Sequence, residues 1–162
     1  MDVEPIIRIA KISDAAEITN CVEAAYRHYI SRIGKPPGPM LDDYSKVIEK
    51  HIAFVAIDEG IVGVLVLIRD PESILLDNVA VHPKYQGRGL GMRLIEHAEL
   101  EAIERGYEKI QLYTHETMTE NFEMYKSLGY QETMRKNVHG YDRIYFEKQL
   151  TFRELPKGAW RC

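Results

Sequence analysis

The sequence predicts an α/β fold: a mixed, mostly antiparallel twisted sheet that is flanked by helices and has one parallel pair of strands at its centre. Two hairpin patterns, an apolar one at residues 52–68 and a second one at 130–148, predict antiparallel strands. Between them, an apolar strand at 74–81 is followed by a long amphipathic helix and a second strand at 109–114. A helix of crossover length between two strands places those strands parallel.

Length and composition predict a single globular domain. The chain has 162 residues, 45% of them hydrophobic, which is enough for one buried core and too short for two. We assign this domain to residues 1–150. Residues 151–162 show no clear period, so we read them as a C-terminal tail or as an arm that packs on a partner.

Charge and cysteine content narrow the class of protein. The net charge is −4 and the basic residues are dispersed, which argues against nucleic acid as a partner. No apolar run approaches the roughly 20 residues of a transmembrane helix, so we expect no membrane partner. Cys21 and Cys162 lack the spacing of a disulfide framework, and the N-terminus lacks a leader pattern. We therefore expect a reduced, cytoplasmic protein.

The N-terminal part predicts a strand, a helix and a loop. Isoleucines at 6–9 indicate the strand, and Asp14 followed by Glu17 has the spacing of a helix capping box. Apolar residues then recur at three- and four-residue steps to about residue 32: Ala15, Ile18, Val22, Ala25 and Tyr29. Residues 34–43 carry three prolines and two glycines, so they predict either a lid or a plain connector. A short helix is expected at 44–51.

The later elements follow from the same rules. The segment 58–60 turns the first hairpin, and 70–73 turns into the central strand. One stripe of the long helix is apolar: Leu90, Leu94, Ile95, Ala98, Ala102 and Ile103. Gly106 ends that helix. A helix is predicted at 118–127, and the second hairpin turns at His139-Gly140.

The turn before the long helix carries the clearest functional signal. Gln86-Gly87-Arg88-Gly89-Leu90-Gly91 places three alternate glycines at the helix start, with Lys84 and Arg93 beside it. Such a turn leaves backbone N–H groups pointing outward at the positive end of the helix dipole, which favours a phosphate. A dinucleotide fingerprint fails at Met92, and no G-K-[ST] triplet closes a P-loop. A tight turn that binds nothing is the alternative.

Two motifs resemble those of the GNAT N-acetyltransferase superfamily. Gln86, Gly89 and Gly91 match its [RQ]-x-x-G-x-G motif, after a strand that ends at Val81-His82-Pro83. Residues 125–130, YKSLGY, match its Y-x-x-x-G-[FY] motif. The likeness extends from about residue 6 to 150, and it is similar in detail to a small bacterial GNAT subgroup whose acceptors are mostly unassigned. The resemblance implies the GNAT fold and acetyl-CoA as cosubstrate.

The resemblance also implies the residues that bind the cosubstrate. They are Val79, Ala80, Val81, Gln86, Gly87, Arg88, Gly89, Leu90, Gly91, Met92, Asn121 and Tyr125. Among these, the Val79 N–H is the expected oxyanion donor and the Val81 N–H the expected contact of the pantetheine arm. The family often has Asn seven residues before the tyrosine; this chain has Met118 there, which puts the role of Asn121 in doubt.

Two side chains are predicted to carry the chemistry. Attack of an amine on a thioester must expel a thiolate, and the Tyr125 hydroxyl can protonate or stabilise that sulfur. An alkylammonium has a pKa near ~10.4, so a base must first remove a proton, and Asp77 on the central strand is the best candidate. The alternatives are a core role for Tyr125 and, for Asp77, an ion pair with a neighbouring strand.

The acceptor itself is left open. The resemblance implies that the region after the first helix covers the acceptor, and the residues there that we expect to bind it are Tyr26, Tyr29, Met40, Asp43 and Tyr44. We predict no metal, because no His or Cys pair has ligand spacing. The prediction is an acetyltransferase that moves an acetyl group from acetyl-CoA to a primary amine, of a small molecule or a peptide, by direct attack. The alternative is a non-catalytic acyl-CoA-binding or sensor module, and a homodimer is left open.

Overall fold

The computed structural model describes residues 4–150, so the predicted tail at 151–162 lies outside the described residues. Seven strands form one hydrogen-bonded sheet in the order β1-β2-β3-β4-β5-β7-β6. They are β1 (Ile6–Ile9), β2 (Ile52–Ile57), β3 (Ile61–Arg69), β4 (Ile74–Val81), β5 (Lys109–His115), β6 (Gln131–Val138) and β7 (Tyr141–Gln149). The β4–β5 pair is parallel, whereas β1–β2, β2–β3, β5–β7 and β6–β7 are antiparallel. The predicted mixed sheet with a parallel pair is confirmed.

The helices lie close to the predicted segments, except that the first one, expected to run to about residue 32, is interrupted by a 3₁₀ turn at Arg27–Tyr29. They are α1 (Ala15–Tyr26), α2 (Ile30–Ile33), α3 (Tyr44–Lys50), α4 (Leu90–Glu104) and α5 (Glu120–Ser127). Short 3₁₀ turns lie at Ile12–Asp14, Arg27–Tyr29, Gly38–Leu41 and Pro83–Tyr85. Within residues 4–150, no helix has the length and apolar character to cross a membrane.

The described chain divides into two compact units, 4–68 with 77–96 and 69–76 with 97–150. Strand β4 and helix α4 each contribute to both units. The assignment of one domain to residues 1–150 stays a prediction.

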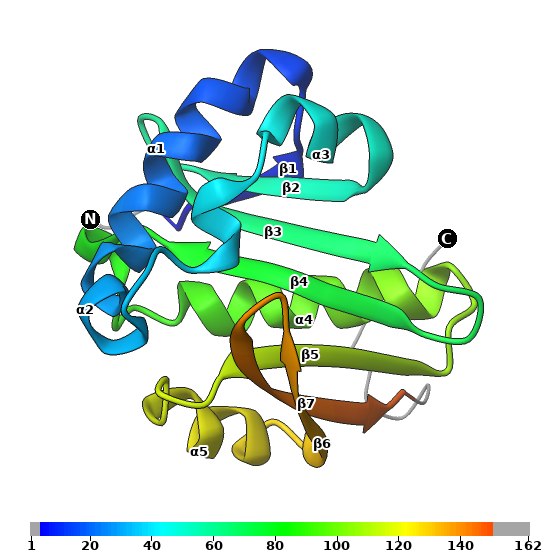
Figure 1. Cartoon of the computed structure of the whole chain (residues 1–162). Coiled ribbons are helices and arrows are strands. Elements are labelled where there is room, and N and C mark those ends of the chain that lie inside the picture. The colour runs from blue at the N-terminus through cyan, green and yellow to red at the C-terminus, as the bar shows by residue number, and fades with distance from the viewer. Residues whose placement is uncertain (1–3, 151–162) are drawn as a thin grey trace. The chain divides into compact units, whose positions relative to one another are not determined.

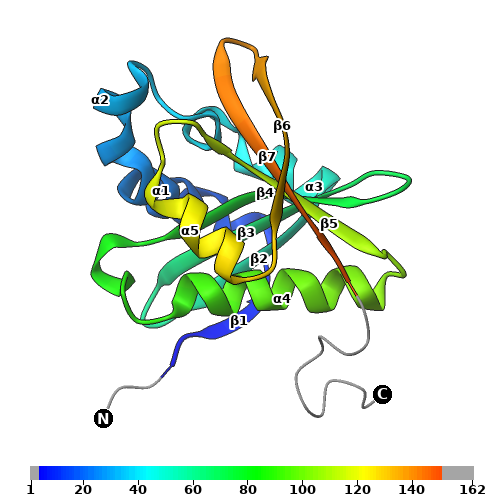
Figure 2. The same cartoon turned by 90° about the horizontal axis from the view of Figure 1, so that it is seen from below.

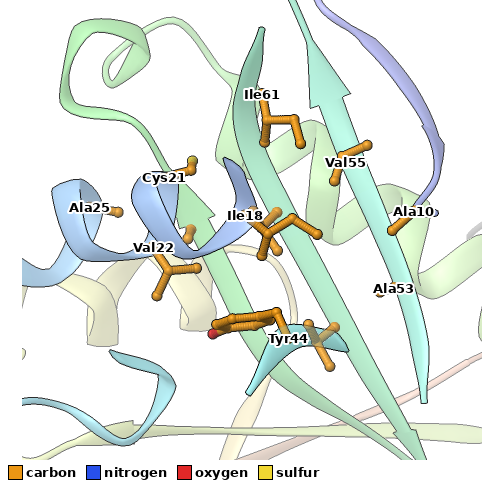
Figure 3. Close-up of a cluster of buried hydrophobic side chains, with 12 residues drawn as sticks. Ala10, Ile18, Cys21, Val22, Ala25, Tyr44, Ala53, Val55 and Ile61 are labelled. Carbon is orange, nitrogen blue, oxygen red and sulfur yellow. The ribbon is translucent and has the colours of Figure 1, made fainter. Parts of the chain in front are cut away.

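In the first unit, α1 and α3 contact each other and pack on β2 and β3 (Figure 1). Figure 3 shows this cluster, to which Ile18 and Val22 of α1, Tyr44 of α3 and Val55 of β2 belong. Ile18, Val22 and Val55 have no exposed surface. The three- and four-residue spacing of the α1 stripe gives the helix its buried face.

The opposite face of β3 lies against the start of α4. A Cβ placed on Gly63 would lie 3.2 Å from Leu94 Cδ1 and 3.3 Å from Leu90 Cδ2. Because glycine has no side chain, the helix approaches the strand closely at this point. The helix that follows the glycine turn is therefore seated on the sheet by its first two turns.

The predicted capping box at the start of α1 is wrong. Asp14 Oδ2 accepts a hydrogen bond from the Lys11 backbone N–H (2.8 Å), and both carboxylate oxygens accept from Arg8 of β1 (2.8 and 3.1 Å). Glu17 Oε2 instead accepts from the Ile61 N–H of β3 (3.2 Å). The two carboxylates satisfy backbone and side-chain donors from neighbouring strands, which local spacing does not reveal.

In the second unit, α5 packs on β7 (Figure 2). The rings of Phe122 and Tyr125 lie 6.1 and 5.6 Å from the ring of Phe146, which is buried. Glu99 of α4 accepts from the Tyr130 hydroxyl (2.9 Å) and from Lys148 Nζ of β7 (2.9 Å). An aromatic layer and one nearly buried ion pair thus fix α4 and α5 on this part of the sheet.

The β6–β7 turn falls where the sequence predicted it. His139 and Gly140 both have positive φ, 51° and 85°, as a two-residue type I′ hairpin turn requires. The turn sets the register in which Lys136 faces Arg143.

Candidate active site

The glycine turn joins β4 to α4 in the first unit. Gly87 and Gly89 have φ of +78° and +82°, in the left-handed region that favours glycine. A Cβ at either position would meet no heavy atom within 4 Å, so the space over both glycines is open. The Arg93 N–H donates to the Gly89 carbonyl (3.1 Å), which makes Gly89 the residue at which the helix begins.

The turn presents a run of open backbone donors. Within the described residues, none of the N–H groups from Gly87 to Met92 donates a hydrogen bond. These groups include the orphan donors of the first helical turn, where the helix dipole is positive. Residues 86–89 are exposed. The turn therefore has the geometry of an anion cradle.

Polar side chains attach the glycine turn to the neighbouring strands. Gln86 Nε2 donates to the Val81 carbonyl (3.1 Å), which ties the turn to the end of β4. The Tyr85 hydroxyl donates to Asp58 Oδ2 (2.7 Å) in the β2–β3 turn, and the Arg88 guanidinium lies 4.9 Å over the Tyr85 ring. The side chain of Gln86, a residue predicted to bind the cosubstrate, thus makes a hydrogen bond within the protein.

Arg93 does not belong to the cradle. Its guanidinium donates to the Pro5 carbonyl (3.0 Å) and lies 4.0 Å from Glu4. The sequence placed it near the helix start, which is correct along the chain, but the side chain is directed to the N-terminal segment. Arg88 and Lys84 are the basic side chains of the turn that remain exposed.

A buried hydrogen-bond network connects β4 to the proline-rich loop. Asn78 is 2% exposed; its Nδ2 donates to the Tyr44 hydroxyl (3.0 Å), which in turn donates to the Pro39 carbonyl (2.6 Å). The Tyr26 hydroxyl lies 2.8 Å from Asn78 Oδ1 and 2.9 Å from the Val79 carbonyl, and donates to one of them at a time. Sequence reasoning missed Asn78, because an Asn in an apolar strand gives no sign of its partners.

Two of the predicted acceptor residues, Tyr44 and Asp43, make hydrogen bonds within the protein. Tyr44 is 2% exposed and fully engaged, and burial, aided by the nearby charges of Asp42 and Asp77, raises the pKa of its hydroxyl. Asp43 accepts from the Ser45 N–H (3.1 Å) and hydroxyl (2.6 Å) as the N-cap of α3. Pro39 is buried, so the loop is anchored at its centre.

The other two predicted acceptor residues are half-buried. Met40 packs against the core of the first unit beside Tyr26. The Tyr29 ring lies 3.9 Å from the His28 ring, with the Arg32 guanidinium 5.1 Å over it. A role for these side chains in acceptor binding stays a prediction.

Asp77 lies on β4 in the first unit, on the same alternation as Val79 and Val81. All three are half-buried, whereas Asn78 and Ala80 between them are buried. The negative charge of Asp77 contributes to the raised pKa of the Tyr44 hydroxyl. A role for Asp77 as the base stays a prediction.

Tyr125 lies in the second unit, on α5. Its ring packs between those of Tyr130 (6.2 Å) and Phe146 (5.6 Å), and the side chain is 9% exposed. Burial raises the pKa of the hydroxyl to about 12, so it stays protonated at neutral pH. Within residues 4–150 this hydroxyl has no hydrogen-bond partner, although buried tyrosines usually have one.

Met118 and Asn121, which precede Tyr125, both make hydrogen bonds with the hydroxyl of Thr114. The buried Met118 Sδ accepts from the Thr114 hydroxyl (3.5 Å), and Asn121 Nδ2 donates weakly to the same hydroxyl (3.5 Å). Asn121 is thus placed at the end of β5 with a long bond. Among the residues described, no group of three or more acidic, His or Cys side chains could hold a metal.

Comparison with known proteins identifies the family. The sequence model of the acetyltransferase (GNAT) domain matches residues 49–132, more than half of the chain. The chain therefore belongs to the GNAT acetyltransferase family, and the family and fold that the two motifs indicated are confirmed. The matched region includes β4, the glycine turn, α4 and the α5 tyrosine.

Curated relatives match over shorter stretches. The [ribosomal protein bS18]-alanine N-acetyltransferase of Escherichia coli K12 is 38% identical over 65 residues, 40% of this chain and 44% of that protein. Mouse N-alpha-acetyltransferase 80 is 39% identical over 61 residues, 38% of this chain and 18% of that protein. The chain thus aligns with less than half the length of either relative.

Solved structures share the fold at low identity. The Escherichia coli ribosomal-protein-S18-alanine N-acetyltransferase aligns with a TM-score of 0.74 at 20% identity, over 91% of this chain and 94% of that one. The PaiA N-acetyltransferase of Thermoplasma acidophilum, solved with coenzyme A, aligns with a TM-score of 0.75 at 16% identity, over 91% and 99%.

Proposed function

We propose that this protein is an acetyl-CoA-dependent N-acetyltransferase that transfers the acetyl group to a primary amine by direct attack. The observation that carries the proposal is the glycine turn, whose N–H groups from Gly87 to Met92 are open and unobstructed. Membership of the GNAT family supports acetyl-CoA as the ligand of such a cradle.

In this proposal the turn binds the pyrophosphate of acetyl-CoA. Its N–H groups would donate to the phosphate oxygens, and the exposed Arg88 and Lys84 add positive charge. Gln86 holds the turn against the end of β4 through its hydrogen bond to the Val81 carbonyl. The family resemblance assigns the pantetheine arm to β4 and the sulfur to the region of Tyr125.

Tyr125 acts as a hydrogen-bond donor to the leaving sulfur. With its pKa near 12, the hydroxyl is a weaker acid than an ordinary thiol, whose pKa is about 8.5. Full proton transfer to the thiolate would be uphill by roughly 5 kcal/mol at 1.36 kcal/mol per pKa unit. A hydrogen bond that stabilises the departing sulfur is therefore favoured over proton transfer.

Asp77 is the proposed base that accepts the amine proton, directly or through water. It is half-buried on β4, on the same alternation as Val79 and Val81. A nearby carboxylate also attracts the ammonium form of the acceptor before it is deprotonated. Another carboxylate or solvent is the competing base, and Asp77→Asn separates them: if Asp77 is the base, the acidic limb of the pH profile of kcat is lost.

The acceptor is an amine of a small molecule or a peptide. The bacterial relative acts on the alanine of a ribosomal protein, which supports a peptide N-terminus as one acceptor to test. Tyr29 and Met40 are two of the predicted contacts, and both side chains are half-buried. We keep the cytoplasm as the proposed location.

The first test compares two glycines of equal backbone strain. Gly89 and Gly106 have φ of +82° and +87°, and a Cβ at either would touch nothing within 4 Å. Ala at either position should lower stability alike, by about 1–2 kcal/mol. Only Gly89→Ala should weaken acetyl-CoA binding by calorimetry, at least tenfold, because the methyl group enters the cradle. Equal affinity of the two variants would refute the cradle.

The second test follows free-thiol release over a panel of amines and N-terminal peptides. Tyr125→Phe should lower kcat by roughly 10²-fold, with the acetyl-CoA affinity nearly unchanged. Retention of full kcat under conditions where chemistry limits the rate would make Tyr125 a packing residue. If no acceptor supports turnover while acetyl-CoA binds, the non-catalytic binding module becomes the better reading.

A further inference from the structure

Three nitrogen-bearing side chains form a row across β5, β7 and β6. His115 of β5 faces Arg143 of β7, and Arg143 faces Lys136 of β6, each as a direct cross-strand partner. Because side chains alternate between the faces of a sheet, the three lie on one face. We call His115, Arg143 and Lys136 the basic row; Figure 2 shows the three strands that carry it.

The basic row is electrostatically unbalanced. Like charges directly opposite each other on adjacent strands destabilise a sheet. Within the described residues neither Lys136 nor Arg143 forms an ion pair, although the protein is acidic overall, with a net charge of −4. An oxyanion bound between the two cations would relieve this repulsion.

The carboxylates of these strands are engaged or distant. Glu132 is paired with Arg135 (3.0 Å), and Asp142 accepts from Asn137 (3.0 Å); Arg135 and Asp142 are next to basic-row residues in sequence, so they face the other side. Glu147 shares the face, but it accepts from Gln111 (3.0 Å). It lies four residues from Arg143 along β7, about 13 Å at the usual rise of a strand, beyond the screening length at physiological salt.

Tyrosine rings hold the two cations in place. The Arg143 guanidinium lies 4.0 Å over the Tyr113 ring, and Lys136 Nζ lies 5.1 Å over the Tyr145 ring. The two tyrosines are themselves cross-strand partners, 5.8 Å apart. A ring face attracts a cation without neutralising its charge, so the N–H donors remain available to a ligand.

His115 adds an N–H donor to the row. Its Nδ1 accepts from the Thr117 backbone N–H (3.2 Å), which leaves the ring proton on Nε2. The row then combines an imidazole N–H, a guanidinium fork and an ammonium, which are the donors that recognise a planar carboxylate or a phosphate.

We propose that the basic row is a binding site for the oxyanion of a small-molecule ligand, a carboxylate or a phosphate group. The site lies wholly within the second unit and does not depend on the proposed transferase activity. It is separate from the glycine turn, which belongs to the first unit.

The test is an NMR titration of the full-length protein with inorganic phosphate and, in a second arm, with acetate. Sodium chloride at matched ionic strength is the reference. We expect saturable shifts centred on His115, Lys136 and Arg143, with a Kd on the order of millimolar. Lys136→Gln and Arg143→Gln should each weaken binding at least tenfold. The matched control is Arg135→Gln, on the same strand but the other face and already ion-paired; it should leave binding unchanged.

A second measurement keeps the proposal testable without a ligand. At low ionic strength, Lys136→Gln should raise the thermal midpoint of the ligand-free protein, because it relieves the like-charge contact with Arg143. Binding in only one arm assigns the oxyanion as phosphate or carboxylate. The proposal is overturned if neither anion gives shifts beyond chloride, or if the shifts survive both basic-row substitutions.

Discussion

The Asn78–Tyr44–Pro39 network gives a prediction whose size follows from the hydrogen bonds. Tyr44→Phe removes one hydroxyl and leaves two buried groups without a partner: Asn78 Nδ2, which donated to it, and the Pro39 carbonyl, which accepted from it. The phenylalanine ring fills the same space, so the packing in the α1–α3 core is kept. The change in the free energy of unfolding then reports the polar groups alone.

If each of the two orphaned buried groups costs about 1–2 kcal/mol, in the lower part of the usual range, Tyr44→Phe should destabilise the protein by about 2–4 kcal/mol. In an Asn78→Leu background, the same change orphans only the Pro39 carbonyl and should cost about half as much. The double-mutant cycle should therefore show a coupling of about 1–2 kcal/mol between Tyr44 and Asn78. For a domain of this size, the single change corresponds to roughly 5–15 °C in Tm.

Urea unfolding of the four proteins in the cycle, followed by far-UV circular dichroism, measures these differences. Tyr107→Phe is the matched control, because its hydroxyl makes no hydrogen bond within residues 4–150. It should change stability by less than about 0.5 kcal/mol. A loss below that size for Tyr44→Phe, or a coupling near zero, would mean that water replaces the hydroxyl and that the network does not anchor the loop.

Two further predictions concern stability. The Arg8 hydrogen bonds lower the pKa of Asp14, so its contribution is present above the unfolded pKa near ~3.9 and is lost as pH falls through the lower folded value. Asp14→Asn should therefore lower the urea midpoint more at pH 7 than at a pH below the unfolded pKa; an equal loss at both would contradict the charge argument. Gly63→Ala should destabilise by about 1–2 kcal/mol, because the new Cβ would lie 3.1 Å from Ala56 Cβ and 3.2 Å from Leu94 Cδ1. A gain in stability there would show that α4 can move away from β3 freely.

The sequence by itself determined the elements and the class of site. Apolar periods of two and of three to four residues located the strands and helices, because burial of one face is a local property of the chain. The glycine turn was equally readable, since Gly87 and Gly89 adopt the positive φ that other residues avoid. The parallel β4–β5 pair followed from the helix between them.

Only the tertiary structure decided the partners of the polar side chains. Asp14 and Glu17 have the spacing of a cap, yet they bond to Arg8 and to β3. Arg93 stands at the cradle in sequence, but its guanidinium bonds to Pro5, 88 residues away.

The same distinction holds for the proline-rich loop at 34–43. Tyr44 and Asn78 are 34 residues apart, and neither has a local feature that predicts their bond. A polar group in a folded chain is satisfied by whichever donor or acceptor the packing of apolar faces brings near it, and this depends on contacts across the whole unit. The apolar period depends only on residues that are close in sequence, whereas the hydrogen-bond partners are determined only when the strands and helices have assembled.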